Sequence, residues 1–265
     1  MMTHMNDYSK ELAFAKAIAL KAGEIITKNF LHSTITTKSN LTPVTETDLA
    51  VSKLVIKEVK KTFPDHKVFD EEYQHKDHNS EFIWVCDPVD GTIPFSHHIP
   101  TSMFSLALCH NGEPVVAVIY DPFMKRMLYT KTKSPSYMNE KEIYVKPGKF
   151  ILGDFIFGIP YWNLDFDTNK YFKLLFDKKI RVTYVESIVY QSMIVAIGIS
   201  KAMVIIAASP WDRAAAKMII ENAGGICTDE NKKRLTVFGN PKYFIATNKE
   251  VHNEIMEIVQ KCLQK

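Results

Sequence analysis

The sequence is poor in cysteine and arginine. The four cysteines lie far apart and form no C-x-x-C pair, so neither a zinc site nor a disulfide framework is indicated. Only four of the 33 basic residues are arginines. A protein that holds phosphate through several bidentate guanidinium groups needs more of them. Any anionic ligand of this chain must therefore be held in another way.

Long apolar runs and blocks of like charge are also missing. The longest apolar stretches, such as residues 203–208, are far shorter than the roughly 20 residues that span a membrane. The first residues contain no apolar segment typical of a signal peptide. A net charge of +3 without a basic block argues against a nucleic-acid partner. We expect a cytoplasmic protein with neither a membrane nor a nucleic-acid partner.

The composition that remains is that of a globular protein. The chain has 265 residues, of which 46% are hydrophobic and 24% are charged, a balance that favours a folded core over disorder. This length fits one large domain or two modest halves. We expect one domain over residues 1–265, with a soft internal boundary in the polar stretch 131–149. The N-terminal α+β half would span about 1–145 and the C-terminal α/β half about 146–265.

Hydrophobic periodicity predicts a layered α/β or α+β protein. Apolar residues recur at three and four over several segments, whereas other apolar runs have the length of strands. Asn111-Gly112, between two such runs, predicts a β-hairpin, which argues against a purely parallel sheet. The predicted helices are 8–32, 48–63, 187–199, 211–223 and 249–262, and the main predicted strands are 82–86, 103–109, 115–120, 126–130, 149–157, 179–184 and 202–207.

Two aspartates follow an apolar strand in the segment D-P-V-D-G-T. We expect Pro88 to end the strand and Gly91 to allow a tight turn, so that Asp87 and Asp90 converge. Mg²⁺ prefers oxygen ligands, and two carboxylates three residues apart around a turn suit it. Pro, Asp and Gly are also typical of structural turns. By itself the segment indicates a structural turn as strongly as a metal site.

Other acidic residues have equally good structural explanations. Glu71 lies in D-E-E after a predicted strand, and Asp212 lies in the first turn of a predicted helix. Asp48 stands in T-E-T-D at the start of another helix. Acidic residues at helix starts are favoured by capping and by the helix dipole. Taken singly, these residues do not identify a site.

Together these segments resemble one family. P-V-T-E-T-D at 43–48, D-E-E at 70–72, W-V-C-D-P-V-D-G-T at 84–92 and P-W-D-R-A-A-A at 210–216 are similar, in order and spacing, to the inositol monophosphatase family. The resemblance spans about residues 10–260. That family contains Mg²⁺-dependent, lithium-sensitive phosphatases of inositol monophosphates, histidinol phosphate, fructose 1,6-bisphosphate and 3'-phosphonucleotides. It implies a five-layer α-β-α-β-α sandwich and a homodimer.

The resemblance also implies roles for individual residues. Asp48 and Thr92 would form the catalytic pair that orients an attacking water. Two or three Mg²⁺ ions would be held by carboxylates and one backbone carbonyl. The backbone N–H groups of Gly91 and Thr92 would bind phosphate at a helix N-terminus, beside Asp90 and Asp212. The implied metal ligands are Glu71, Asp87 and the Val89 carbonyl for a first ion, and Asp87, Asp90 and Asp212 for a second.

The substrate pocket departs from the family pattern. After D-G-T the family continues T-N-F, but here Ile93 and Pro94 precede the phenylalanine. The glutamate that contacts inositol hydroxyls in the family falls on Ile205, and a glycine of the S-x-G-[ST]-A turn has become Val189. We therefore expect intact metal chemistry and an altered substrate pocket, in which the effect of these changes on inositol specificity stays open.

Three further residues are candidates for substrate or metal contact. The segment that begins at Lys38 resembles the histidinol-phosphatase-like branch of the family, so Lys38 is a candidate for a place near the metals, whereas an ordinary surface lysine is the default interpretation. His97 and His98 follow the D-G-T segment. They are candidate substrate contacts, with a solvated or structural role as the alternative.

The leading hypothesis is a Mg²⁺-dependent phosphomonoesterase that acts on a small-molecule phosphate ester. Inositol monophosphate is the first candidate substrate, histidinol phosphate the second, and a 3'-phosphonucleotide or sugar phosphate the third. The alternative from a different class is a non-catalytic homologue that binds metal or phosphate. The presence of both Asp48 and Thr92 argues against that alternative.

Overall fold

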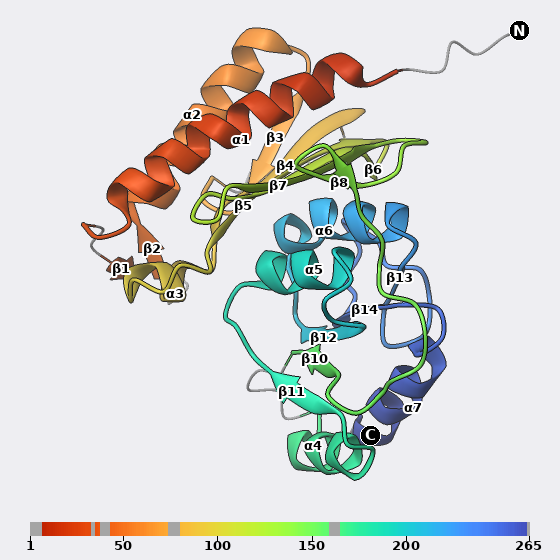
Figure 1. Cartoon of the computed structure of the whole chain (residues 1–265). Coiled ribbons are helices and arrows are strands. Elements are labelled where there is room, and N and C mark those ends of the chain that lie inside the picture. Colours follow the sequence, from red (N-terminus) through yellow and green to blue (C-terminus); the bar gives the residue numbers. More distant parts are fainter. Residues whose placement is uncertain (1–6, 33–34, 38–42, 74–79, 159–164, 264–265) are drawn as a thin grey trace, which may run out of the picture.

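The computed structural model describes residues 7–32, 35–37, 43–73, 80–158 and 165–263. The elements form five layers (Figure 1). A pair of helices covers a seven-stranded sheet, a second pair lies between this sheet and a five-stranded one, and a third pair covers the outer face. The predicted five-layer sandwich is confirmed. In layer order the helix pairs are α1 (Ser9–Asn29) with α2 (Glu46–Thr62), α5 (Ile188–Ala196) with α6 (Pro210–Asn222), and α4 (Thr168–Asp177) with α7 (His252–Cys262).

The seven-stranded sheet has the order β3-β4-β5-β6-β7-β8-β9. Its first pair is parallel and the others are antiparallel. Successive side chains of a strand point to opposite faces: Trp84 packs under α1 and α2, whereas Val85 joins the core with α5 and α6. The strands are β3 (Lys67–Asp70), β4 (Phe82–Asp90), β5 (Met103–His110), β6 (Glu113–Asp121), β7 (Arg126–Lys131), β8 (Tyr137–Met138) and β9 (Lys141–Glu142).

The five-stranded sheet has the order β11-β10-β12-β14-β13. Its middle strand β12 is buried at every position because helices cover both faces, which explains its continuous apolar run. The strands are β10 (Phe155–Phe157), β11 (Arg181–Thr183), β12 (Ala202–Ile206), β13 (Ile226–Thr228) and β14 (Tyr243–Thr247). The small sheet of β1 (Ile35–Thr37) and β2 (Pro43–Thr45) completes the strands of the described part of the chain.

One expectation about β4 is wrong. Pro88 does not end the strand: β4 continues to Asp90 through an irregularity, with Asp87 opposite Ser105 and Asp90 opposite Met103. Proline is tolerated in a sheet at such irregularities. The consequence for the site is that both aspartates are fixed by strand pairing rather than by a free turn.

The other predictions differ from the structure mainly in the lengths of the elements and in two helices that local sequence patterns do not reveal. The hairpin at Asn111 and Gly112 is confirmed, with φ angles of 49° and 84° that a two-residue hairpin requires. The strand predicted at 149–157 shrinks to β10. Helix α4 was not predicted, and α3 (Thr92–Ser96) was expected only as the helix start that the family resemblance implies at Gly91 and Thr92. Across the described residues, no helix is both long and apolar enough to cross a membrane.

Candidate active site

Three buried carboxylates meet between the two sheets. Asp87 and Asp90 stand at the end of β4, and Asp212 is the third residue of α6. One carboxylate oxygen from each lies within 4.8 Å of the others, although the side chains are only 2%, 5% and 8% exposed. The convergence expected of Asp87 and Asp90 is therefore observed, with Asp212 added from the other half of the chain.

Asp90 is held by the first turn of α5. Its carboxylate accepts hydrogen bonds from the Ser187 hydroxyl, from the Ile188 backbone N–H at 3.1 Å and from the Val189 backbone N–H at 2.9 Å. Free N–H groups at a helix N-terminus favour a negative charge. Because Val189 contributes its backbone, the loss of a glycine there leaves this contact intact.

Gly91 connects Asp90 to α3 by a left-handed turn. Its φ of 86° is disfavoured for residues with a side chain. A β-carbon at this position would lie 2.9 Å from the Glu186 carbonyl oxygen and 3.0 Å from the Ser187 β-carbon. Glycine is thus required both by the turn and by the close approach of the segment before α5. The next residue, Thr92, begins α3.

Asp48 and Thr92 are in contact. The Thr92 hydroxyl lies 3.4 Å from Asp48 Oδ1 and 3.4 Å from the Val89 carbonyl oxygen. The other Asp48 oxygen, Oδ2, accepts the Thr45 backbone N–H at 2.9 Å and the Thr45 hydroxyl. Thr45 therefore fixes the carboxylate that faces Thr92.

Burial raises the pKa of four carboxyl groups of the site, those of Asp48, Asp87, Asp90 and Asp212. The pKa rises to about 6 for Asp48 and Asp90, and well above the ordinary value for Asp87 and Asp212. Burial is the largest cause, because it penalises the charged form. Repulsion from neighbouring carboxylates adds to it; Glu71, in the bend after β3, contributes in all four cases. A cation bound here would relieve this repulsion.

The residues present fit a metal ion. Within the described chain, Asp87 Oδ1 is buried and has no hydrogen-bond partner, which is costly unless something else binds it. Three carboxylate oxygens within reach of one point form a donor set of the kind that hard divalent cations prefer. The acidic cluster could therefore bind a metal.

The residues that depart from the family pattern, and the other candidate contacts, lie in different parts of the structure. Ile205 lies in β12 and is buried in the core between the sheets. Ile93 is exposed at the start of α3, whereas Pro94 is buried. His97 bonds the Ile93 carbonyl through Nδ1 at 2.9 Å, and His98 packs against the Phe30 ring. Both histidines are exposed, and their role as substrate contacts stays a prediction. Lys38 lies outside the described residues.

Two supporting residues were missed by the sequence analysis. Ser187 begins the altered S-x-G-[ST]-A turn and Arg213 belongs to the P-W-D-R segment, but the sequence predicted no role for either residue. Ser187 bonds Asp90, and Arg213, next to Asp212, donates to three backbone carbonyls. A buried arginine could not be recognised from composition, because arginine is usually exposed.

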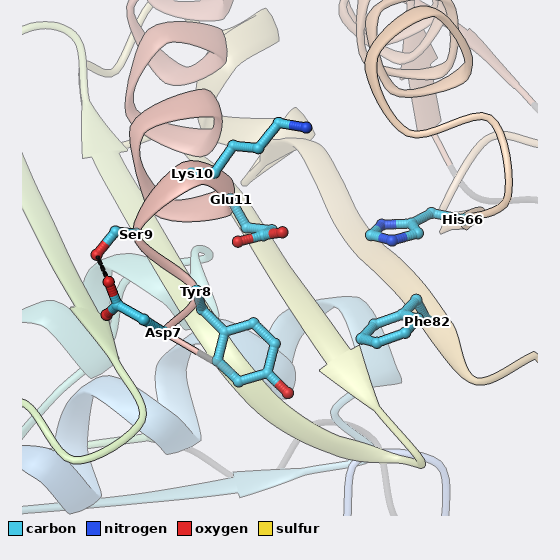
Figure 2. Close-up of a pocket in the computed structure, with 7 residues that line it drawn as sticks. All are labelled: Asp7, Tyr8, Ser9, Lys10, Glu11, His66 and Phe82. Atoms are coloured by element: carbon cyan, nitrogen blue, oxygen red, sulfur yellow. Dashed lines mark hydrogen bonds between the residues drawn. The ribbon is translucent and has the colours of Figure 1, made fainter. Parts of the chain in front are cut away.

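Cavities also occur at the far end of β4. Two adjoining cavities of about 400 and 460 Å³ share His66 and Phe82. Figure 2 shows Tyr8 and Glu11 facing these two rings across the first cavity. Trp84 Nε1–H donates to His66 Nδ1 at 3.1 Å. None of the acidic residues of the cluster lines either cavity, so this region is distinct from the carboxylate site.

Three curated proteins are similar to this chain over most of its length. Inositol monophosphatase 1 of Solanum lycopersicum is 32% identical over 263 residues, covering 94% of each chain. A protein of Thermotoga maritima named fructose-1,6-bisphosphatase/inositol-1-monophosphatase is 30% identical over 222 residues, covering 84% of each. Nus factor SuhB of Escherichia coli is 28% identical, covering 94% of this chain and 98% of its own.

Solved structures show the same architecture. An inositol monophosphatase (IMPase) of Thermotoga maritima superposes with a TM-score of 0.85 at 28% identity, covering 95% of this chain and 97% of its own. One from Anabaena has a TM-score of 0.83 at 24% identity, covering 97% and 98%, and supports the fold. The model of the inositol monophosphatase family matches residues 7–264. With this match over nearly its whole length, the chain belongs to the inositol monophosphatase family.

Proposed function

We propose that the chain is a Mg²⁺-dependent phosphomonoesterase that hydrolyses small-molecule phosphate esters. One observation carries the proposal: the buried cluster of Asp87, Asp90 and Asp212 lies next to a hydroxyl–carboxylate pair, Thr92 and Asp48. A metal site alone would not need that pair. Membership of a family of phosphatase-type hydrolases agrees with this assignment.

The carboxylates and one carbonyl would hold the metal ions. In this proposal Glu71, Asp87 and the Val89 carbonyl bind one Mg²⁺, and Asp87, Asp90 and Asp212 bind a second. When bound, the ions would lower the pKa of a water molecule and neutralise negative charge on the phosphate. The Asp87 oxygen without a hydrogen-bond partner supports its role as the shared ligand.

Thr92 and Asp48 would position the water and receive its proton. The Thr92 hydroxyl can donate to Asp48 Oδ1 and accept from a water molecule at the same time. Burial raises the pKa of Asp48 to about 6, which suits a general base that works near neutral pH. Thr45 holds the other oxygen, so the carboxylate keeps its orientation as the proton arrives.

The start of α3 would bind the phosphate. Gly91 is the residue before the helix and Thr92 is its first residue, so their backbone N–H groups are among those without a partner inside the helix. Such groups bind anions well. This arrangement allows phosphate binding in a chain that has only four arginines.

The substrate itself is the finer part of the proposal. Inositol monophosphate is the first candidate, followed by histidinol phosphate and by 3'-phosphonucleotides or sugar phosphates. The names of two relatives include inositol monophosphatase and fructose-1,6-bisphosphatase. The buried, apolar Ile205, in place of a glutamate that would bind hydroxyls, favours a substrate that makes fewer hydrogen bonds on that side.

A phosphate-release screen tests the proposal. The purified chain is incubated with inositol 1-phosphate, histidinol phosphate, fructose 1,6-bisphosphate and adenosine 3',5'-bisphosphate, with Mg²⁺ or with EDTA. We expect Mg²⁺-dependent release from at least one of them, and none from Asp87→Asn. If wild-type protein releases phosphate from no substrate, or does so equally in EDTA, the proposal is wrong.

A second candidate function is binding without turnover. Some relatives are named Nus factor SuhB rather than phosphatase, which favours considering a non-catalytic homologue that binds metal or phosphate. Calorimetric binding of Mg²⁺ without phosphate release would support this alternative.

Two further expectations stay predictions. A homodimer is to be tested by light scattering on the purified chain, which should give twice the mass of 30.3 kDa. A cytoplasmic location is to be tested by fractionation of cells.

A further inference from the structure

Arg213 is a buried arginine whose partners are carbonyl groups. It is 3% exposed, and its three guanidinium nitrogens donate to three backbone oxygens. The acceptors are Ala208 at 2.5 Å, Val237 at 2.8 Å and Gly239 at 2.5 Å. Burial of a cation is costly unless its donors are satisfied. The contacts thus join the turn before α6 to the loop that contains Val237 and Gly239.

The turn held by Arg213 is in an unfavourable conformation. Ala207 directly follows β12 and has a φ of 56°, in the left-handed region that residues with a β-carbon disfavour. Its N–H donates to the Lys242 carbonyl at 2.9 Å. Such a conformation persists only where surrounding contacts impose it. The Arg213 bond to Ala208, the next residue, is one of those contacts.

The same turn carries the hydrogen-bond donor of Asp212. The Ser209 backbone N–H donates to Asp212 Oδ2 at 2.6 Å. Ser209 directly follows the residue whose carbonyl Arg213 holds. Any rotation of the turn would therefore move this N–H and release the carboxylate.

We propose that Arg213 is a positioning residue that holds the turn 207–209 so that Ser209 orients the carboxylate of Asp212 toward Asp87 and Asp90. This inference rests on the proposed function, because it gives Asp212 the role of a metal ligand. Arg213 acts through the turn, from the side of the loop 237–239, and touches neither the substrate nor the metal.

Arginine suits this role better than lysine. Its planar guanidinium presents five donors in a fixed fork, whereas lysine presents three on a single rotating nitrogen. In this structure the three nitrogens of Arg213 each reach a different carbonyl. A lysine at this position can approach one or two of them and leaves the others without a partner.

The test measures Mg²⁺ affinity by titration calorimetry on the full chain, independently of turnover. Partners that orient a metal ligand typically contribute about 10-fold to 100-fold in affinity. We expect Arg213→Met and Arg213→Lys each to weaken Mg²⁺ binding at least about tenfold. In activity assays, the Mg²⁺ concentration that gives half-maximal rate should rise by the same factor, while KM at saturating Mg²⁺ changes little.

Lys201→Met is the matched control. Lys201 is equally buried, at 2% exposure, and donates to the Lys149 carbonyl at 2.6 Å and to Asp154 at 2.5 Å. It lies at the other end of β12 from the turn. This variant should lower the melting temperature but leave Mg²⁺ affinity unchanged. Equal Mg²⁺ affinities for folded Arg213→Met, Lys201→Met and wild type would overturn the inference.

A second pair of variants applies if Arg213→Met does not fold. Ser209 has a φ of −76°, which proline adopts, so Ser209→Pro keeps this backbone angle, removes the N–H and places the ring Cδ where Asp212 Oδ2 now lies. We expect it to weaken Mg²⁺ binding as Arg213→Lys does, whereas Ser209→Ala, which keeps the N–H, should not. Unchanged affinity in both Arg213→Lys and Ser209→Pro would contradict the inference. If wild type itself binds no Mg²⁺, the proposed function fails instead.

Discussion

Asp48 and Asp212 occupy the same position in two different helices. Each is the third residue of its helix, and each accepts a hydrogen bond from the backbone N–H of the residue before the helix. The N–H of Thr45 lies 2.9 Å from Asp48, and that of Ser209 lies 2.6 Å from Asp212. In both residues, Oδ2 bonds the helix start, which leaves Oδ1 available to the site. The sequence allows two explanations for these aspartates, helix capping and a role in the site. The structure shows that the two are compatible.

Neutralising Asp87 should lower activity but raise the stability of the metal-free protein. Asp87→Asn is expected to reduce Mg²⁺-dependent hydrolysis by more than the roughly 10-fold to 100-fold that loss of a hydrogen-bond partner of a metal ligand costs, because here the shared ligand itself is weakened. Without metal, the same variant should melt at a higher temperature than wild type, since neighbouring carboxylates and burial raise the Asp87 pKa and a neutral side chain relieves that repulsion. Phosphate release and thermal melts in EDTA measure the two effects.

Asp121→Asn is the control for this experiment. Asp121 is also buried, but its carboxylate is held by Arg126 at 2.6 Å. Its substitution should lower stability, by up to about 3–5 kcal/mol as for other broken buried pairs, and leave the Mg²⁺ dependence of hydrolysis intact. A melting temperature that falls equally in both variants would contradict the role given to Asp87.

The Thr92 hydroxyl should matter for turnover and not for metal binding. Thr92→Ala removes the group that contacts Asp48, so kcat should fall by roughly 10²–10⁴-fold, the usual contribution of general-base catalysis. Mg²⁺ affinity should change little. Thr92→Ser keeps the hydroxyl and should retain most of the activity. The role is refuted if Thr92→Ala stays folded and keeps its kcat.

Two glycines with nearly equal φ angles should respond differently to substitution. Gly91 and Gly112 have φ angles of 86° and 84°, so an alanine is strained in either place by about 1 kcal/mol. At Gly112 the nearest atom to an added β-carbon is 4.0 Å away, whereas at Gly91 it is a backbone oxygen at 2.9 Å. Gly91→Ala should therefore destabilise more and also abolish activity. Urea unfolding and phosphate release give the comparison, and equal losses of stability would contradict it.

The carboxylate of Asp90 should make the metal-free protein sensitive to pH. Burial raises its pKa from 3.8 to about 6, so between these values the folded state binds the proton more tightly than the unfolded state. The free energy of unfolding contributed by this group is therefore present at low pH and falls as the pH rises from 4 to 6. A shift of about two pKa units corresponds to roughly 3 kcal/mol.

A comparison with Asp90→Asn isolates this contribution, because the variant cannot titrate there. Urea unfolding in EDTA at pH 4 and pH 7 should show the variant gaining stability relative to wild type by a few kcal/mol as the pH rises. Added Mg²⁺ should shrink that gain, since a cation favours the charged carboxylate of wild type. A stability difference that is the same at both pH values would show that Asp90 ionises normally.

Local sequence patterns predict most of the layers of the fold. The periodicity of 8–32 and 48–63 predicts α1 and α2, and the Asn111-Gly112 turn predicts the β5–β6 hairpin, because amphipathic spacing and turn chemistry act within a few residues. Helix α3 has only five residues and includes Pro94, so it has no detectable period. The continuation of β4 past Pro88 depends on the pairing with β5, which no local signal encodes.

The sequence by itself determined which carboxylates this protein has and which family it belongs to, since the spacing of the acidic motifs is a property of the chain. Only the tertiary structure decided how those carboxylates are held. Asp90 is fixed by backbone N–H groups of α5 and Asp212 by a turn that Arg213 holds from residues 237 and 239. Backbone donors and acceptors are the same in every residue, so the sequence cannot indicate which of them will meet a given side chain until folding brings distant segments together.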